Sequence, residues 1–98
     1  MVNAMSSSIQ RELKTLVDQS LKSLEARSLR FTRVSVKELN VGFEVNVKIY
    51  LDRPIKFNSV YELSKKIADK YNLSLNDIMI YAPHTRALRL HFIISKKR

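Results

Sequence analysis

The chain has no cysteine, so disulfide bonds, thiolate metal ligands and cysteine nucleophiles are all excluded. Its single glycine, Gly42, cannot form a glycine-rich phosphate loop. The two histidines, His84 and His91, are flanked by no carboxylate, unlike a helical zinc pair with its glutamate. The acidic residues between Glu38 and Asp77 are scattered along the chain. We therefore expect no enzymatic activity, no metal and no cofactor.

Long apolar runs are also absent. Runs such as residues 78–82 are far shorter than the roughly 20 residues that span a bilayer. The first residues, MVNAMSSS, have neither the basic segment nor the apolar segment of a secretory signal. The expected location is intracellular and cytoplasmic, with no membrane insertion.

Negative charge is scarce, with nine acidic residues against eighteen lysines and arginines and a net charge of +9. A small domain with this excess attracts polyanions: nucleic acid, an acidic protein or an anionic lipid surface. The lipid surface ranks last, because residues 9–24 include acidic positions and no aromatic anchor. After Asp77 the chain has no acidic residue, and residues 96–98 form a basic tail that predicts solvated charge for binding a polyanion.

Two segments have the apolar spacing of amphipathic helices. In residues 9–24, Ile9, Leu13, Leu16, Val17, Leu21 and Leu24 recur at three- and four-residue steps. A capping box of Ser7 and Gln10 predicts the start of this helix and leaves residues 1–6 as a short flexible N-terminus, although Ser6 and Ser8 serve equally well as caps. A second capping box, Ser59 with Glu62, predicts the start of a helix that continues to Tyr71.

Four segments alternate like strands: residues 31–38, 43–51, 77–82 and 87–95. The second has the cleanest alternation and is predicted to be central; Pro54 follows it and cannot join a ladder. Between the first two strands, Gly42 is expected to take a positive φ angle in a hairpin turn.

The predicted order is therefore α-β-β-α-β-β in a single domain covering residues 1–98. We expect a two-layer α+β sandwich: a four-stranded antiparallel sheet with both helices on the face of Val34, Val47, Ile80 and Leu90. The strand order 3-4-2-1, a circularly permuted ferredoxin-like arrangement, places the two most hydrophobic strands at the centre.

The other sheet face then carries cations, aromatic rings and a few apolar side chains. Cations can meet phosphates and rings can stack on bases, so this face is a candidate platform for single-stranded DNA or RNA. Neither the signature of the RNA-recognition motif nor the GXXG clamp of the KH domain is present, so the analogy is physical only. The predicted nucleic-acid-binding residues are Arg33, Lys37, Lys48, Tyr50, Tyr81, Arg86, Arg89, His91, Lys96, Lys97 and Arg98.

A protein interface on the same face is the alternative. Met79 and Ile93 would lie beside Tyr50 and Tyr81, and such a surface could join a homodimer or an acidic partner. In that case the apolar side chains would matter more than the charges.

Overall fold

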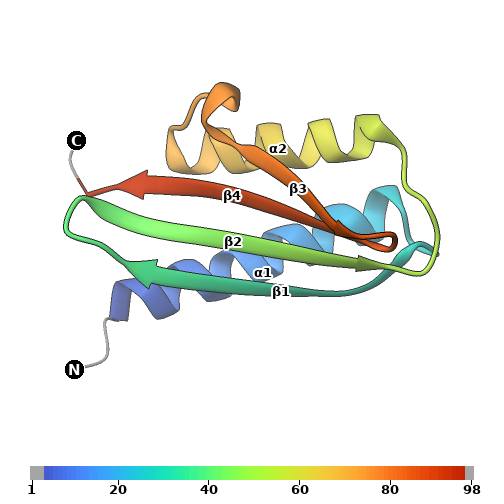
Figure 1. Ribbon diagram of the computed structural model, residues 1–98, viewed down its shortest axis with the longest axis horizontal. Coiled ribbons are helices and arrows are strands. Elements are labelled where there is room, and N and C mark those ends of the chain that lie inside the picture. The colour runs from blue at the N-terminus through green and yellow to red at the C-terminus, as the bar shows by residue number, and fades with distance from the viewer. Residues whose placement is uncertain (1–3, 97–98) are drawn as a thin grey trace.

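The computed structural model describes residues 4–96; the predictions for Lys97, Arg98 and residues 1–3 lie outside this range. The elements are α1 (Ala4–Leu24), β1 (Leu29–Glu38), β2 (Gly42–Leu51), α2 (Phe57–Tyr71), the short 3-10 helix η1 (Leu75–Asp77), β3 (Met79–His84) and β4 (Ala87–Ser95) (Figure 1).

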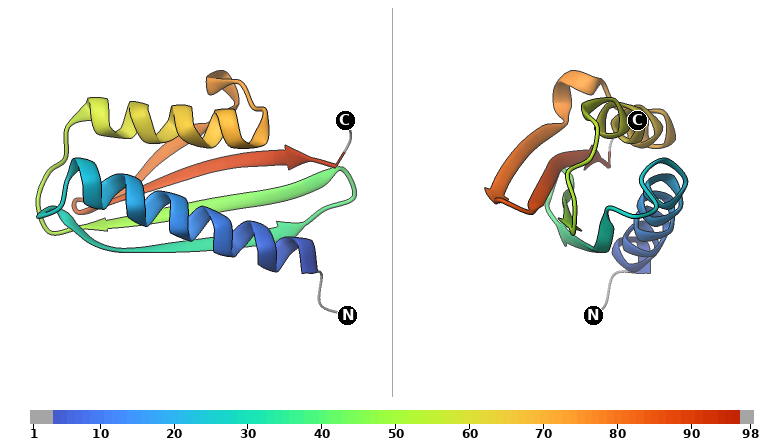
Figure 2. Two further views of the ribbon diagram at one scale, coloured as in Figure 1. Left: turned by 180° about the vertical axis from the view of Figure 1, so that it is seen from behind. Right: turned by 90° about the vertical axis from the view of Figure 1, so that its right-hand side faces the viewer.

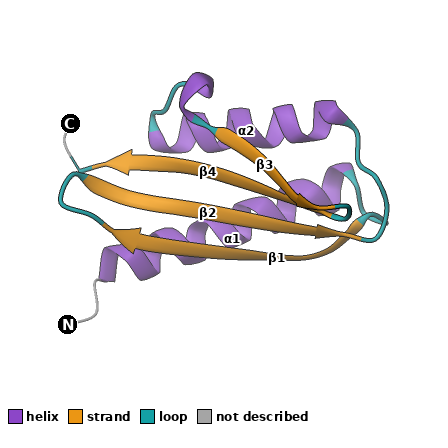
Figure 3. Cartoon of the chain, viewed as in Figure 1, coloured by secondary structure: helices purple, strands orange, loops and turns teal. Residues whose placement is uncertain are grey.

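The four strands form one antiparallel sheet in the order β1-β2-β4-β3 (Figure 3). Both helices lie on one face of this sheet, and the other face is open (Figure 2). The predicted two-layer α+β sandwich and its strand order are thus confirmed. The result follows from the sequence because two amphipathic helices need an apolar partner, which one face of one sheet supplies.

The core lies between the helices and the sheet. Along α1, Ile9, Leu13, Val17 and Leu21 stand four residues apart and are all buried. They pack against the inward side chains of the sheet, where Val34, Val47 and Leu90 are paired across three strands. Burying each Leu, Ile or Val of this kind stabilises the fold by about 1.5–3 kcal/mol.

Polar contacts fix α1 on β1. The Thr32 hydroxyl, buried on the helix side of β1, donates a hydrogen bond to Asp18 Oδ1 at 2.5 Å. Lys14 Nζ lies 3.2 Å from Asp18 Oδ2 and donates to the Thr32 carbonyl oxygen at 3.1 Å. A buried hydroxyl left without a partner costs about 1–3 kcal/mol, so these three residues help to select this docking of α1.

Both predicted helix starts were wrong. α1 begins at Ala4, before the predicted Ser7 cap, so residues 4–6 are helical. α2 begins at Phe57, and its N-cap residue Lys56 makes no side-chain capping hydrogen bond.

Glu25, next to the C-terminal end of α1, accepts the hydrogen bonds that hold the start of α2. Its Oε2 accepts hydrogen bonds from the Ser59 hydroxyl at 2.6 Å and from the Lys56 backbone N–H at 2.9 Å. The Ser59 hydrogen bond, followed by that from Lys56, lowers the pKa of Glu25 below its usual value. Ser59 therefore bonds to a residue of the preceding helix, and the predicted capping box with Glu62 does not form.

The predicted reason for a glycine at position 42 was also wrong, because the φ angle of Gly42 is not positive. A Cβ atom at this position would meet the carbonyl oxygen of Ile94 on the neighbouring strand β4. The glycine is required because two backbones approach closely there. The left-handed position is Asn72, with a φ of 57°, which ends α2.

β3 begins at Met79, later than predicted, and all of its residues are exposed. The predicted turn contains η1, which has a real capping box between Ser74 and Asp77. Ile80 pairs with Leu90 on the helix side, as expected, but it is 50% exposed because the helices do not cover this edge of the sheet.

Candidate nucleic-acid interface

Three cations stand side by side across the open face of the sheet. The strand register pairs Arg33 of β1 with Lys48 of β2, and Lys48 with Arg89 of β4. Neighbouring strands are about 4.8 Å apart, so the three positions span roughly 10 Å. We call Arg33, Lys48 and Arg89 the basic row. Within residues 4–96, none of the three forms an ion pair with a carboxylate.

Tyr81 extends the basic row onto β3. It pairs with Arg89, and the Arg89 guanidinium carbon lies 4.5 Å from the centre of the Tyr81 ring. This cation–π contact holds the guanidinium in place. The Arg89 Nε atom is buried and has no hydrogen-bond partner in the described part of the chain. One face of Tyr81, which was predicted to bind nucleic acid, is therefore already occupied by Arg89.

Phe31 and Tyr50 form a stacked pair beside the basic row. They occupy paired positions on β1 and β2, with ring centroids 4.4 Å apart and planes inclined by 18°. Phe31 is 42% exposed, whereas Tyr50 is half-buried. Phe31 thus gives this face an exposed ring that the sequence prediction missed. The signal was present, because Phe31 has the same strand parity as Arg33.

The next part of the face is nearly neutral. His91 Nε2 lies 3.0 Å from Glu44 Oε2, and the His91 ring meets the Tyr81 ring edge-on. Lys37 lies directly opposite Glu44 in the register of β1 and β2. The net positive charge of the face is therefore concentrated at the basic row.

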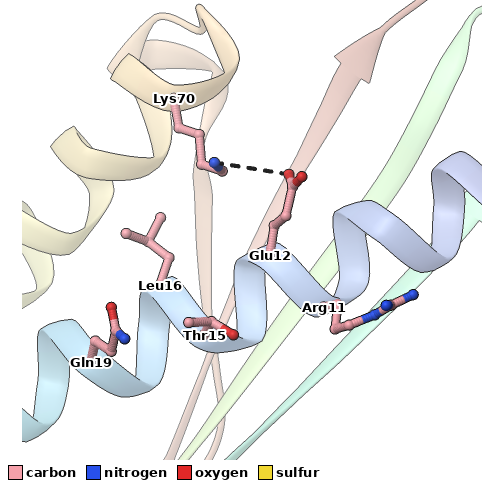
Figure 4. A pocket seen from close by; sticks show the side chains of 6 residues that line it. All are labelled: Arg11, Glu12, Thr15, Leu16, Gln19 and Lys70. Carbon is pink, nitrogen blue, oxygen red and sulfur yellow. Dashed lines mark ion pairs between the residues drawn. The ribbon is translucent and has the colours of Figure 1, made fainter.

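Other carboxylates serve the helix layer. Glu12 lies 3.9 Å from Lys70 Nζ, and the two side chains point toward each other across a surface hollow of about 400 Å³ between α1 and α2 (Figure 4). Glu12 also accepts a hydrogen bond from the Tyr71 hydroxyl at 3.1 Å. Burial, followed by the Glu12 charge, raises the pKa of Tyr71 well above its usual range. Asp18 and Glu25 make the contacts described above, so these three carboxylates lie away from the open face.

Lys96 does not join the open face. Its Nζ lies 2.6 Å from Glu38 Oε2 and 5.4 Å from the centre of the Phe43 ring, and Glu38 and Phe43 are paired on the helix side of the sheet. The prediction that Lys96 belongs to a free basic tail was therefore wrong. Lys97 and Arg98 lie outside the described residues.

Arg86 lies in the turn between β3 and β4, at one end of the sheet. Backbone hydrogen bonds join this turn to two other loops: Leu51 N–H donates to the Arg86 carbonyl oxygen at 2.9 Å, and Asp52 N–H to that of Ser28 at 2.7 Å. Arg53 and Arg86, both exposed, line one hollow at this end of the sheet, a pairing that the sequence prediction did not make.

Among residues 4–96 no group of three or more histidine, aspartate and glutamate side chains could hold a metal ion. No helix in the same range is long and apolar enough to cross a bilayer. Comparisons with protein-family models, with curated proteins and with solved structures found no match for this chain.

Proposed function

We propose that the open sheet face binds single-stranded nucleic acid, mainly through its phosphates and with little sequence specificity. The observation that carries this proposal is the basic row, three cations on three adjacent strands that have no carboxylate partner among residues 4–96. Phosphate oxygens are natural acceptors for arginine and lysine, which here are already held near one another. Arg86 and the neighbouring Arg53 extend the positive charge to the end of the sheet.

Phe31 and Tyr50 suit a single strand better than a duplex. Bases of a duplex are stacked on one another, whereas unpaired bases are free to stack on an exposed ring. Such stacking contributes about 1–3 kcal/mol per base in single-strand-binding proteins. Phe31 is the outer ring of the pair, so a base is expected to stack on Phe31, while Tyr50 supports it from behind.

The remaining predicted residues are expected to contribute less to binding. Tyr81 positions Arg89, and Lys37 and His91 lie around Glu44, so each contributes less charge than the basic row. We propose no catalytic step for this face. Backbone contacts and ring stacking recognise features that all nucleotides share, so specificity is expected to be weak.

Fluorescence anisotropy with labelled oligonucleotides of about 12 nucleotides, both DNA and RNA, tests the proposal. We expect a Kd in the micromolar range, roughly 1–100 µM, for single strands. The double variant Arg33→Gln/Lys48→Gln should bind at least about tenfold more weakly. The matched control is Arg11→Gln/Lys22→Gln, which removes the same charge from exposed positions of α1.

Equal weakening by both double variants would mean that net charge alone, and not the sheet face, attracts the oligonucleotide. Absence of binding by the unmodified chain at low salt would refute the proposal altogether.

An acidic protein is the second candidate for the same face. Met79, Tyr81 and Ile93 are exposed there, and an apolar patch surrounded by cations suits a protein partner with carboxylates. In that case Ile93→Ser should weaken the complex more than Arg33→Gln does, whereas the nucleic-acid proposal predicts the reverse order.

A further inference from the structure

The two edges of the sheet differ in how they are protected. β1 carries Arg33, Lys37 and Glu38, charges of the kind that keep an edge strand from pairing with another chain. β3 has no lysine or arginine, and all six of its residues are exposed. Every second residue of an edge strand points its backbone N–H and C=O away from the sheet. Residues 79–81, the regular part of β3, therefore offer an open pairing edge, whereas Pro83, which has no N–H donor, and the irregular register between Tyr81 and His84 protect the rest of the strand.

The edge at β3 is also where this cationic molecule has least positive charge. No lysine or arginine occurs between Lys70 and Arg86, and that segment includes the acidic Asp77. Two copies, each with a net charge of +9, repel when their cationic surfaces meet. Contact through β3 keeps Arg33 and Lys48 of both copies apart, because β1 and β2 lie beyond β4, and brings Arg89, which packs on Tyr81, closest to the partner.

An apolar groove lies next to this edge, on the helix side. It is lined by Phe57, Val60, Tyr61, Ser64, Leu75, Ile78 and Ile80 and has a volume of about 220 Å³. Phe57 is 81% exposed, although it is a large apolar side chain on a helix. In Figure 2, η1 lies beside the end of α2, and β3 runs away from the helix, which leaves this edge of the sheet uncovered.

We infer that β3 pairs with β3 of a second copy, antiparallel, about a twofold axis perpendicular to the sheet. The strand then supplies the same edge to both copies, as a twofold interface requires. All helices stay on one side of an eight-stranded sheet, so Ile80 of one copy meets Ile80 or its neighbours in the other. The grooves of both copies lie beside the axis and are covered together. This interface differs from one through the open face, and it does not depend on nucleic-acid binding.

Single-cysteine variants test the register directly, because the chain has no cysteine of its own. Cysteines placed one at a time at Ile80 and Tyr81 lie in the regularly paired part of β3, and each crosslinks when the twofold axis passes at its position. A disulfide forms readily only when the Cα atoms are about 4.4–6.8 Å apart, which fits directly opposed residues of antiparallel strands. Controls are Val41→Cys in the exposed β1–β2 turn and Ser35→Cys on the open face.

We expect oxidation to give a covalent dimer much faster from a cysteine at position 80 or 81 than from either control. Fastest crosslinking through Ser35→Cys would show a face-to-face dimer and overturn the inference. Equal rates at all four positions would indicate random collisions and overturn it as well.

Sedimentation velocity measures the same association without crosslinking. The unmodified chain should pass from monomer to dimer between about 5 and 500 µM, because a pairing edge with one small groove is a weak interface. Ile80→Lys should remain monomeric over this range, whereas the charge-matched Val41→Lys should dimerise like the unmodified chain. A chain that stays monomeric at the highest concentration, in salt that screens its charge, would show that another molecule or none covers the β3 edge.

Discussion

Gly42 is a residue whose importance comes from an absent side chain. Its neighbour Ile94 lies on β4, and the β4 backbone occupies the space where a Cβ atom would be. Replacement by alanine must push β2 and β4 apart at the start of their ladder. We expect Gly42→Ala to lower the free energy of unfolding by about 1–3 kcal/mol, measured by urea denaturation.

The control for this change is Asn40→Ala in the same turn, where the side chain is exposed. That variant should stay within about 0.5 kcal/mol of the unmodified chain. If the two variants are equally stable, the close approach at Gly42 does not determine the need for glycine.

Glu25 gives the fold a dependence on pH. Its pKa is lowered in the folded state, first by the Ser59 hydrogen bond, so its contribution to stability is fully present above the unfolded value near 4.5. This contribution is lost as the pH falls through the lower folded pKa. We expect Glu25→Gln to be less stable than the unmodified chain at pH 7, with a difference that shrinks below about pH 4.5.

Urea denaturation of both chains from pH 7 to pH 2.5 measures this difference. Asp69→Asn is the control, because Asp69 is exposed and makes none of the side-chain hydrogen bonds or ion pairs found among residues 4–96. A difference between Glu25→Gln and the unmodified chain that stays constant down to pH 2.5 would contradict the role assigned to this carboxylate.

Single residues were the hardest to predict from the sequence. The parity of β1 places Arg33 on the open face correctly, because alternation is a local property. The partner of Ser59 is not local: Glu25 reaches it only once α1 and α2 pack together. The position of Lys96 likewise depends on Glu38, which is distant in the sequence and near only in the sheet.

At the scale of elements, β2 and β3 differ most strongly in burial. β2 pairs on both sides and buries Val45, Val47 and Ile49, whereas β3 pairs on one side and is exposed throughout. We expect backbone amides of β3 to exchange with deuterium fastest among the four strands in dilute solution. Hydrogen exchange followed by mass spectrometry measures this order.

Measuring exchange at several protein concentrations distinguishes protection of the β3 amides within one copy from protection by pairing with a second copy. At high concentration its amides should become slower to exchange if copies pair there, while those of β1 should not change. Protection of β3 equal to that of β2 in dilute solution would contradict the exposed edge.

The elements themselves were predictable, and their ends were less so. Periodicity identified both helices and all four strands, and the strand order followed from placing the most apolar strands centrally. Ala4 and Phe57 begin helices earlier than the serine caps suggested. Three neighbouring serines share the capping pattern near Ala4, and near Phe57 the Ser59 hydroxyl bonds to Glu25. The exposure of β3 could not be predicted, because it depends on how far α2 reaches over the sheet.

At the scale of the whole molecule, several carboxylates are used in contacts of the helix layer, away from the open face. Glu12, Asp18 and Glu25 hold the helix layer together, so their negative charge is used where α1 meets α2 and β1. The open face keeps its cations largely uncompensated. Under the proposed function, a polyanion contacts the basic row, and the carboxylates of the helix layer keep their structural contacts.

Contact with the basic row predicts how binding depends on salt. For single strands the logarithm of the affinity falls by about 0.7 per neutralised phosphate for each tenfold rise in salt. About four contacts should give a slope near −2.8, so raising salt from roughly 50 to 200 mM should weaken binding about fiftyfold. Arg33→Gln, Lys48→Gln and Arg89→Gln should each reduce the magnitude of the slope by about 0.7, whereas Lys22→Gln on α1 should not. Anisotropy titrations at several salt concentrations measure these slopes, and a flat salt dependence in the unmodified chain would mean that the basic row does not bind phosphates.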